Sequence, residues 1–474
     1  MDITLNAVQG RRAQRLLELH KQYGPIVRLG PNEVSVGDWR YYRHIYGNAK
    51  TTTKDEAFYS SATLIGKPNL FEMRNKDLHA ARRKLTASPY SMASMKTLEP
   101  LVAERADALV SRLISSSSVS GTADVFELCA LFSMEVICKA GFAKDFTGTA
   151  DDDARAVIKA MELSAFQLLF NTAMPWLKKT GLATKLPGLI GDSYRGHEYW
   201  IVKSREMVDH LMSQQSSATT KMAGNCEFLL TPILTGTDSH LGRKLTHEEI
   251  VEEAMGIMFA GSGTTSATLM YLLYSLSIPE NKPMQTRLRE ELRTVADPED
   301  LVTIKTLPYV NAVIKETFRL YPTIISTLPR ILDESLVVDN HILPAGTVVG
   351  MQNFVHHRDP TLFLKPDAFI PERWLQTSQG TRPCNQEGIL LEEMNQALTP
   401  FSIGRRNCIG QNLAWSELYI AVNKVFRRVE LDLAQEMMQG VGKGGVRGEE
   451  DMEMVDRFAV VPKGRKCIVQ VKEL

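Results

Sequence analysis

One decapeptide near the C-terminal end decides the fold, and it reads Phe401-Ser402-Ile403-Gly404-Arg405-Arg406-Asn407-Cys408-Ile409-Gly410. It fits the pattern F-x-x-G-x-R-x-C-x-G at all five fixed positions. From average residue usage, a chance match in a chain of 474 residues has odds on the order of one in ten thousand. A lone cysteine is most often buried and inert, but that reading does not explain a cysteine inside this decapeptide. The six cysteines are scattered without a C-x-x-C pair, which fits a reducing compartment and gives no disulfide scaffold.

The decapeptide is the signature of the cytochromes P-450, the haem-thiolate monooxygenases, and the sequence resembles that family. The resemblance implies that Cys408 is the axial thiolate ligand of haem b, where a thiolate pushes electron density onto the iron and favours O–O cleavage. The thiolate has to be ionised, so backbone N–H groups and positive charge are expected around it. Gly404 and Gly410 permit a tight loop near the sulfur, and Gly410 also lets the next helix start close against the porphyrin. Arg406 is expected to bind a haem propionate, and Phe401 belongs to the same cofactor-binding loop.

The motif E-x-x-R occurs at Glu316-Thr317-Phe318-Arg319 and again at Glu290-Glu291-Leu292-Arg293. Because glutamate and arginine three residues apart merely share one helix face, the motif alone is a weak signal. Only the first copy is followed by Leu320-Tyr321-Pro322 and then by Pro371-Glu372-Arg373-Trp374, as in the family. The resemblance therefore implies a buried ion network of Glu316, Arg319 and Arg373 that locks the haem-binding core.

The central stretch Ala260-Gly261-Ser262-Gly263-Thr264-Thr265 resembles the oxygen-binding A-G-x-D/E-T-T of the family. The resemblance places Ala260 and Gly261 against the haem and makes Thr264 the alcohol that relays protons to dioxygen. Gly263 stands where the family has an acid, so the usual acid–alcohol relay is in doubt. Glu253 lies 11 residues before Thr264, about 16 Å along a helix, which is too far to replace it. We expect a water chain or a polar group of the substrate to deliver the proton; plain packing glycines in a core helix are the alternative.

Further basic residues are assigned by the same resemblance. His79-Ala80-Ala81-Arg82-Arg83 is similar to the family's W/H-x-x-x-R, which implies that His79 and Arg83 contact a propionate. Arg330 matches another propionate-binding arginine. A basic face near the thiolate would suit an acidic reductase, and the residues expected to form it are Arg82, Arg83, Lys84, Arg405 and Arg406. An ordinary solvated surface is the alternative for Lys84 and Arg405.

Composition limits the class of protein. The chain has 55 basic and 55 acidic residues, and this zero net charge argues against a nucleic-acid partner. Hydrophobic residues at 44% and charged residues at 23% exclude a disordered, collagen-like or multi-span membrane chain. The length alone suggests two or three domains. The resemblance, however, runs from Tyr23 to the C-terminal strand and implies one cytochrome P-450 domain over residues 1–474.

The periodicity predicts a mainly α protein with small β-sheets, and the resemblance implies the cytochrome P-450 fold, with haem between a long central helix and the cysteine loop. Helices are expected at 98–114, 125–142, 151–170, 194–213, 246–278, 284–296 and 308–320. Serine- and glycine-rich breaks are expected at 115–121 and 214–225, and a polar loop at 376–398. Strands are expected as a hairpin of 26–29 with 33–36, as a pair of 335–338 with 347–350, and as a tail strand at 467–471.

Membrane attachment is considered at three places. The uncharged stretch 254–279 is long enough to span a bilayer, but its small and polar centre favours a helix buried in a globular core. The first ten residues form neither a signal peptide nor an anchor. Family relatives usually carry an N-terminal anchor, so we expect a trimmed start or attachment by an apolar surface alone. Met174 to Lys179 and Leu182 to Ile190 are candidates for that surface, and a plain interhelical loop is the alternative. The family's usual place is the cytosolic face of the endoplasmic reticulum.

The implied reaction inserts one oxygen atom of dioxygen into an organic substrate. The overall sequence resembles fungal enzymes of secondary metabolism. Such enzymes draw electrons from NADPH through cytochrome P-450 reductase, with cytochrome b5 as a further donor. The family's substrate-contacting segments are mostly apolar here and imply a lipophilic substrate; they are 59–71, Phe259, Ala260, 323–328 and Phe458. Two alternatives stay open, namely a haem-thiolate isomerase or peroxide-using enzyme without a reductase, and a non-catalytic haem protein.

Overall fold

A long helix, α11 (His247–Ser277), runs through the interior of the molecule and organises the fold. In this computed structural model its first turn carries a capping box, in which the Thr246 hydroxyl accepts from the Glu249 N–H and the Glu249 carboxylate accepts from the Thr246 N–H. Every residue from Thr265 to Ser277 is buried. The stretch is therefore a core helix, as predicted. Among the described residues, no helix is long and apolar enough to cross a membrane.

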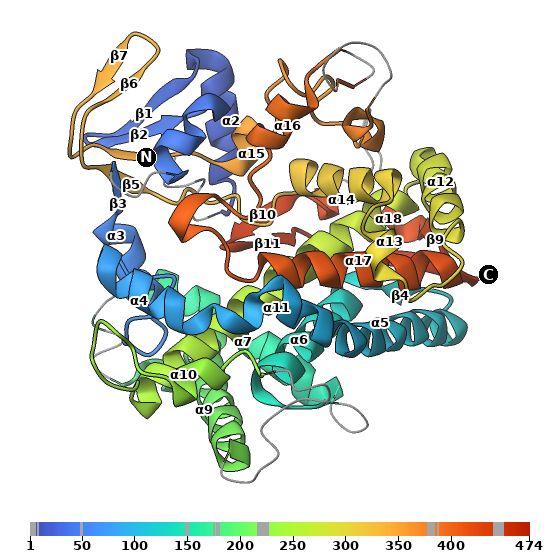
Figure 1. Cartoon of the computed structure of the whole chain (residues 1–474), viewed down its shortest axis with the longest axis horizontal. Coiled ribbons are helices and arrows are strands. Elements are labelled where there is room, and N and C mark those ends of the chain that lie inside the picture. The colour runs from blue at the N-terminus through green and yellow to red at the C-terminus, as the bar shows by residue number, and fades with distance from the viewer. Residues whose placement is uncertain are drawn as a thin grey trace.

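The structure describes the whole chain apart from residues 1–5, 7–8, 48–50, 147–150, 174–175, 177–180, 216–226, 377–383, 386–387 and 439–449. The other α-helices with their bounds are α2 (Arg12–Tyr23), α3 (Glu56–Tyr59), α4 (Lys76–Thr86), α5 (Met92–Ser120), α6 (Val125–Phe142), α7 (Asp151–Ala173), α9 (Gly188–Gln215), α10 (Thr231–Thr235), α12 (Lys282–Arg293), α13 (Leu301–Ile304), α14 (Pro308–Leu320), α15 (Asn353–His356), α16 (Leu391–Ala397), α17 (Gln411–Arg428) and α18 (Gln435–Met438). In Figure 1, α6 lies along α11, α7 packs on α9 and α5 packs on α17, whereas α2 and α15 pack on each other away from α11. Buried apolar side chains from Ala13 to Val469 form one continuous core around α11.

The strands form small sheets, most of them toward the edge of the molecule and one, the hairpin of residues 454–462, near its centre (Figure 1). The largest has the order β1-β2-β8-β5-β3, made of β1 (Ile26–Gly30), β2 (Glu33–Val36), β8 (Val348–Gly350), β5 (Arg330–Leu332) and β3 (Thr52–Lys54). The others pair β6 (Leu336–Val338) with β7 (His341–Leu343), β10 (Met454–Arg457) with β11 (Ala459–Pro462), and β12 (Ile468–Glu473) with both β4 (Ala123–Asp124) and β9 (Val429–Leu433). β1 and β2 are antiparallel, which confirms the predicted hairpin.

The predicted pairing of 335–338 with 347–350 is wrong. β6 instead turns back directly onto β7 through Asp339 and Asn340, and Asp339 takes a φ of 48° in this two-residue turn. β8 then runs parallel to β2, so that segments from both ends of the chain share one sheet. Sequence signals for turns did not separate these two arrangements because Pro344-Ala345-Gly346 also forms a turn.

Two predicted irregular segments are helical. α5 continues through the serine run to Ser120, where the predicted break was 115–121. The hydroxyls of Ser118 and Ser120 donate to carbonyls one turn earlier, each at 2.8 Å, and Gly121 ends the helix with φ 78°. The predicted polar loop 376–398 contains α16. The predicted break at 214–225 falls almost entirely outside the described residues.

Candidate functional site

The cysteine loop is fixed by its backbone and by one aromatic side chain. Gly404 has a φ of 73°, and a Cβ there would lie 2.6 Å from the Gly47 carbonyl oxygen, so the loop requires glycine. The Cys408 N–H donates to the Phe401 carbonyl at 2.9 Å. The Phe401 ring packs edge-on against Phe318 of α14, with centroids 5.2 Å apart. The loop therefore holds Cys408 at a defined place just before α17.

The side chain of Cys408 is accessible although it lies deep in the protein. It is exposed, yet burial raises the pKa of its thiol, which fits a sulfur that faces an internal space. The Gly410 N–H and the charge of Arg83 oppose that rise. A coordinating thiol loses its proton outright, so a metal ion on this sulfur would reverse the effect of burial. A Cβ on Gly410 would lie an ordinary 3.9 Å from the sulfur, so the close approach of a porphyrin remains the expected reason for this glycine.

The centre of α11 also presents accessible surface, although much of the helix is buried. Ala260 is exposed. One turn later the Thr264 hydroxyl donates to the Ala260 carbonyl at 2.8 Å. A Cβ on Gly261 would lie 2.5 Å from Ile137 of α6, so this glycine allows the two helices to pack closely.

Gly263 is not required by packing. Of the described residues, a Cβ there would meet Ala459 alone, at 3.5 Å, so a carboxylate side chain could begin at this position. Glu253 does not supply the missing acid, because its carboxylate accepts from the buried guanidinium of Arg82 and from the Leu70 N–H. The absent acid is thus a departure that the fold itself does not impose.

Four basic side chains gather near the cysteine loop without forming an ion pair to any described carboxylate: Lys54 of β3, His79 of α4, Arg330 of β5 and Arg406. Burial lowers the pKa of Lys54 well below its usual value, and Arg330 and Arg406 lower it further. Burial and then the charges of Arg406, Lys54 and Arg83 lower the pKa of His79 to about 3. Arg406 donates only to backbone carbonyls, at 2.6 and 3.2 Å.

This donor set fits a haem. Buried cations need a nearby anion, and the two propionates of haem b are such anions. Lys54, His79, Arg330 and Arg406 would hold the propionates, and the accessible sulfur of Cys408 would hold the iron. The accessible surface of Ala260 leaves space beside the central helix.

The E-x-x-R network is formed as expected. Glu316, Arg319 and Arg373 are all completely buried, and the Glu316 carboxylate accepts from both arginines at 2.7 and 3.2 Å. The Trp374 indole N–H and the Ile370 N–H also donate to Glu316, each at 2.9 Å. The network joins α14 to the segment that precedes the cysteine loop.

The chain matches the cytochrome P-450 family model over residues 3–441. It belongs to the cytochrome P-450 family. The structure of a cyanobacterial member, the retinoic acid-bound CYP120A1, superposes with a TM-score of 0.73 at 19% identity over 96% of this chain and 93% of that chain, which confirms the fold. Similar proteins include three cytochrome P-450 monooxygenases: tazI of Aspergillus terreus (28% identical over 98% of this chain and 89% of the relative), TRI4 of Fusarium sporotrichioides (30%, 90% and 79%) and macH of Penicillium terrestre (28%, 90% and 82%). Family and fold imply haem with a cysteine thiolate ligand.

Two adjacent arginines of this cytochrome P-450 take different roles. Arg82 was expected on a basic docking face, but it is buried and forms ion pairs with Asp238 and Glu253, so that expectation is wrong. Arg83 donates to the backbone carbonyl and the side-chain oxygen of Asn407, at 2.5 and 2.7 Å. In this structure Arg83 therefore ties α4 to the cysteine loop; its contact with a propionate stays a prediction.

A buried acid that sequence reasoning missed holds the loop before α4. Glu252 of α11 accepts from the N–H groups of Leu64, Ile65 and Lys67, at 2.7, 2.7 and 3.3 Å, and from the Asn69 side chain at 2.7 Å. The loop lies within the predicted substrate-contacting segment 59–71. The two consecutive acids Glu252 and Glu253 were the available signal, since charged residues in a core helix need partners.

Three phenylalanines bring the predicted substrate-contacting segments together. The Phe458 ring, in the β10–β11 turn, lies 5.3 Å from Phe71 and 5.7 Å from Phe259 of α11. Phe458 has a φ of 75°, a conformation that non-glycine residues rarely adopt. Segments distant in the sequence thus form one aromatic wall beside Ala260.

Proposed function

We propose that this cytochrome P-450 uses dioxygen and two electrons to insert one oxygen atom into a lipophilic organic molecule while the other oxygen atom becomes water. The observation that carries the proposal is the exposed Cys408 in its fixed loop, next to basic side chains that form no ion pair with any carboxylate of the described residues. The similar monooxygenases of Aspergillus, Fusarium and Penicillium support a fungal enzyme of secondary metabolism.

When bound, haem supplies the iron at which dioxygen is activated. The chain supplies the positions around it: Cys408 for the iron, and Lys54, His79, Arg330 and Arg406 for the propionates. The Thr264 hydroxyl lies one helical turn from the accessible Ala260 and donates to its carbonyl. Its oxygen keeps free lone pairs, so this side chain can accept a hydrogen bond from water and pass a proton toward the space beside Ala260.

The aromatic wall of Phe71, Phe259 and Phe458 supports a lipophilic substrate. Aromatic side chains bury a large apolar area and select for shape. The segment around Glu252 fixes one side of this wall, because its loop carries the residues that precede Phe71. Hydroxylation, desaturation and epoxidation are all compatible with this geometry.

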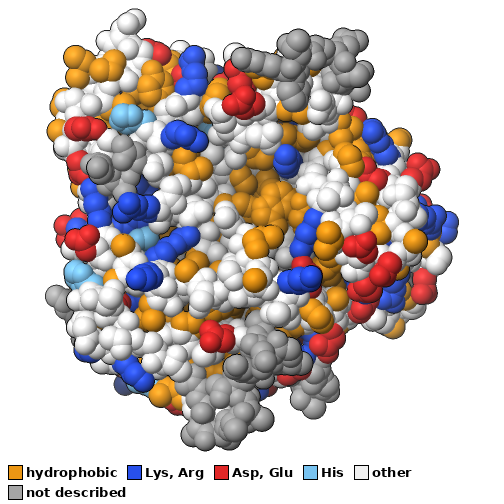
Figure 2. Space-filling view, viewed as in Figure 1, with side chains coloured by type: hydrophobic (Ala, Val, Ile, Leu, Met, Phe, Trp, Pro, Cys, Tyr) orange, Lys and Arg blue, Asp and Glu red, His pale blue; other side chains and the backbone are white. Residues whose placement is uncertain are grey.

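Electrons from NADPH through cytochrome P-450 reductase, with cytochrome b5 as a second donor, complete the proposed reaction. Figure 2 shows lysine and arginine side chains gathered over the part of this face where α3 and α4 lie. Lys84 of α4 and Arg405 of the cysteine loop are both exposed. Such a basic face would attract an acidic flavoprotein domain.

We further propose attachment to the cytosolic face of the endoplasmic reticulum by an apolar surface. Trp176, Leu182 and Leu189 are 58%, 52% and 47% exposed and lie close together in sequence. Most of Met174 to Lys179 lies outside the described residues. Flotation with phosphatidylcholine vesicles tests this point, with Leu182→Ser and Leu189→Ser expected to weaken binding and Val302→Ser, on an exposed site elsewhere, expected to leave it unchanged.

The experiment that tests the function is the carbon monoxide difference spectrum of the reduced protein. The wild type should give the red-shifted band of thiolate ligation, Cys408→Ser should lose it, and Cys384→Ser should keep it. Haem binding without that band would refute thiolate ligation, and no haem binding at all would refute the assignment of the site.

A peroxide-using enzyme without a reductase is the second candidate, because Gly263 leaves the helix without its acid. The two are separated by oxygen consumption with NADPH and reductase. Consumption that depends on both supports the monooxygenase, whereas product formed only with added hydrogen peroxide supports the alternative. A non-catalytic haem protein would consume no oxygen with any substrate.

A further inference from the structure

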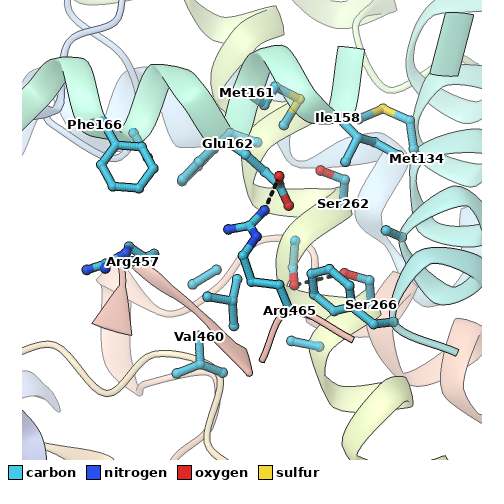
Figure 3. Close-up of a pocket in the computed structure, with 18 residues that line it drawn as sticks. Met134, Ile158, Met161, Glu162, Phe166, Ser262, Ser266, Arg457, Val460 and Arg465 are labelled. Atoms are coloured by element: carbon cyan, nitrogen blue, oxygen red, sulfur yellow. Dashed lines mark hydrogen bonds and ion pairs between the residues drawn. The ribbon is translucent and has the colours of Figure 1, made fainter. Parts of the chain in front are cut away.

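A cavity lies between α6, α7, α11 and the β10–β11 hairpin (Figure 3). Most of its lining is apolar, from residues such as Met134, Ile158, Met161 and Phe166. The polar side chains at its wall are few: Glu162, Ser262, Ser266, Arg457 and Arg465. A cavity that touches the central helix of a monooxygenase with a few polar groups can hold ordered water.

Gly263 lies at the helix side of this cavity. Within the part of the chain that the structure describes, a Cβ at 263 would meet the Ala459 Cβ at 3.5 Å and no other atom within 4 Å. Since successive helix residues are about 100° apart, Gly263 borders the face that carries Ala260 and Thr264. At position 263, therefore, no side chain stands between the cavity and the face that carries Thr264.

Among the described residues that line the cavity, Glu162 is the one carboxylate. It comes from α7 and forms an ion pair with Arg465, as Figure 3 shows. Burial raises the pKa of Glu162, and Arg465 opposes that rise. The other cation of the lining is Arg457, 5.4 Å from the Phe166 ring; the residues lining the cavity from α6 and α11 carry no charge.

Arg465 connects the cavity to solvent. Its side chain is 44% exposed, and it lies in the turn after β11 with a φ of 52°. The carboxylate of Glu162 is less exposed, at 32%. An arginine that can move outward on such a turn leaves the carboxylate facing the cavity on one side and solvent on the other.

We propose that Glu162 supplies, from α7, the carboxylate that position 263 lacks, and that protons reach Thr264 through water in this cavity. This inference rests on the proposed monooxygenase function. That reaction consumes one substrate, one dioxygen, two electrons from the reductase and two protons, and it yields one oxygenated product and one water. Glu162 gives a proton to cavity water, which passes it past Gly263 to the Thr264 hydroxyl, and Glu162 regains a proton from solvent beside Arg465.

The test compares Glu162→Gln with Arg465→Gln in the haem-loaded protein with reductase and NADPH. Hydrogen peroxide released per dioxygen consumed is measured across pH. Positioned general acids typically contribute at least about 100-fold, so Glu162→Gln should raise the peroxide share at least several-fold and remove the alkaline decline of the rate. Arg465→Gln keeps the carboxyl and should shift that decline to higher pH. Equal losses in both variants without a pH shift would show a merely structural ion pair and overturn the inference.

Relocating the acid is the second arm. Gly263→Asp added to Glu162→Gln should restore low peroxide release, because the space at 263 admits a side chain, whereas Gly263→Asp alone should change little. The exposed Glu198→Gln of α9 is the matched control. Turnover supported by added hydrogen peroxide, which brings oxygen and protons together, should be unaffected by Glu162→Gln.

A third readout is independent of turnover. Infrared titration of the resting protein should show a carboxyl group with a raised pKa that is absent in Glu162→Gln and present in Glu198→Gln; its absence in the wild type would overturn the inference. The carbon monoxide spectrum distinguishes failure of the proposed function from failure of the inference about Glu162. If the wild type lacks the thiolate band, the proposed function and this inference fail together. If the band is intact but Glu162→Gln behaves like Glu198→Gln, this inference alone fails.

Discussion

Glu316 and Arg319 lie one turn apart on α14, both completely buried, and the Arg319 guanidinium donates to both carboxylate oxygens of Glu316 at 2.7 and 2.9 Å. Arg319 uses its remaining donors on the carbonyls of His357, Pro366 and Ala368. Because every charged group in this cluster has a partner, its hydrogen bonds and charge pairing oppose the desolvation cost of burial, and loss of one partner would leave the others uncompensated.

Removing one partner should therefore be severe. We expect Glu316→Ala to destabilise the protein by about 3–5 kcal/mol, because Arg319 and Arg373 would be left buried without an anion. Urea unfolding of the haem-loaded protein measures this loss. Arg319→Lys should also destabilise, since lysine cannot reproduce the two parallel hydrogen bonds.

The second E-x-x-R copy provides the control. Glu290 and Arg293 of α12 are exposed, so Glu290→Ala should change the free energy of unfolding by no more than about 0.5 kcal/mol. Similar losses for Glu316→Ala and Glu290→Ala would contradict the structural distinction between the two copies.

The loop held by Glu252 should loosen when that acid is removed. Glu252→Ala leaves three backbone N–H groups without their acceptor, so we expect faster hydrogen exchange at residues 64–70. A lipophilic azole would bind the haem iron and reach into the space that segment 59–71 is expected to line, so it should bind more weakly in the variant. Glu248→Ala on the same helix removes a half-buried acid that pairs with Arg205 instead of the loop. It should change neither the exchange nor the azole affinity, and equal effects of both variants would refute a specific role for Glu252.

The sequence predicted the site where a motif fixed several positions at once. Glu316, Arg319 and Arg373 meet as expected, and Cys408 lies in a tight loop that requires glycine at position 404. Where no motif applied, the sequence did not distinguish the roles of neighbouring residues. Arg82 and Arg83 are adjacent in a basic run. Arg82 is the one that points into the core, because its ion-pair partners Asp238 and Glu253, far away in sequence, lie there.

Lys54 and Glu252 show why the other residues of the site could not be predicted from the sequence. Lys54 follows three threonines at a strand end, which looks like a polar surface, and its burial depends on the rings of Tyr59 and Phe71 folding over its ammonium group. The acceptors of Glu252 arise only when the loop 64–70 reaches α11. Both sites depend on tertiary contacts that no local pattern encodes.

Glu417 predicts how stability depends on pH. This acid of α17 is buried, and burial raises its pKa from 4.5 to about 8, against a hydrogen bond from Thr265. The folded state therefore keeps a proton that the unfolded state loses above pH 4.5. The contribution of Glu417 to the free energy of unfolding is fully present below that pH. Above it, this contribution falls by up to about 1.4 kcal/mol per pH unit until the pH passes about 8.

Glu417→Gln should remove this slope, because the amide cannot ionise. Urea unfolding at pH 5, 6.5 and 8 measures this pH dependence. The free energy of unfolding of the variant should increase relative to that of the wild type as the pH rises. The exposed Glu393→Gln serves as the control. If wild type and Glu417→Gln show parallel pH dependence, then Glu417 is ionised in the folded protein.

Lys54 tests the haem fit without a measurement of turnover. Its ammonium group is buried, lies near Arg330 and Arg406, and has a pKa well below its usual value. Without haem this arrangement costs free energy, so Lys54→Met should raise the stability of the haem-free protein. With haem the same lysine faces a propionate, and losing a charged hydrogen bond should weaken haem retention by about 1.5–3 kcal/mol. Transfer of haem to apomyoglobin measures retention, and Lys67→Met, on an exposed lysine of the neighbouring loop, should change neither quantity. A Lys54→Met protein that retains haem as well as the wild type would show that this lysine does not hold a propionate.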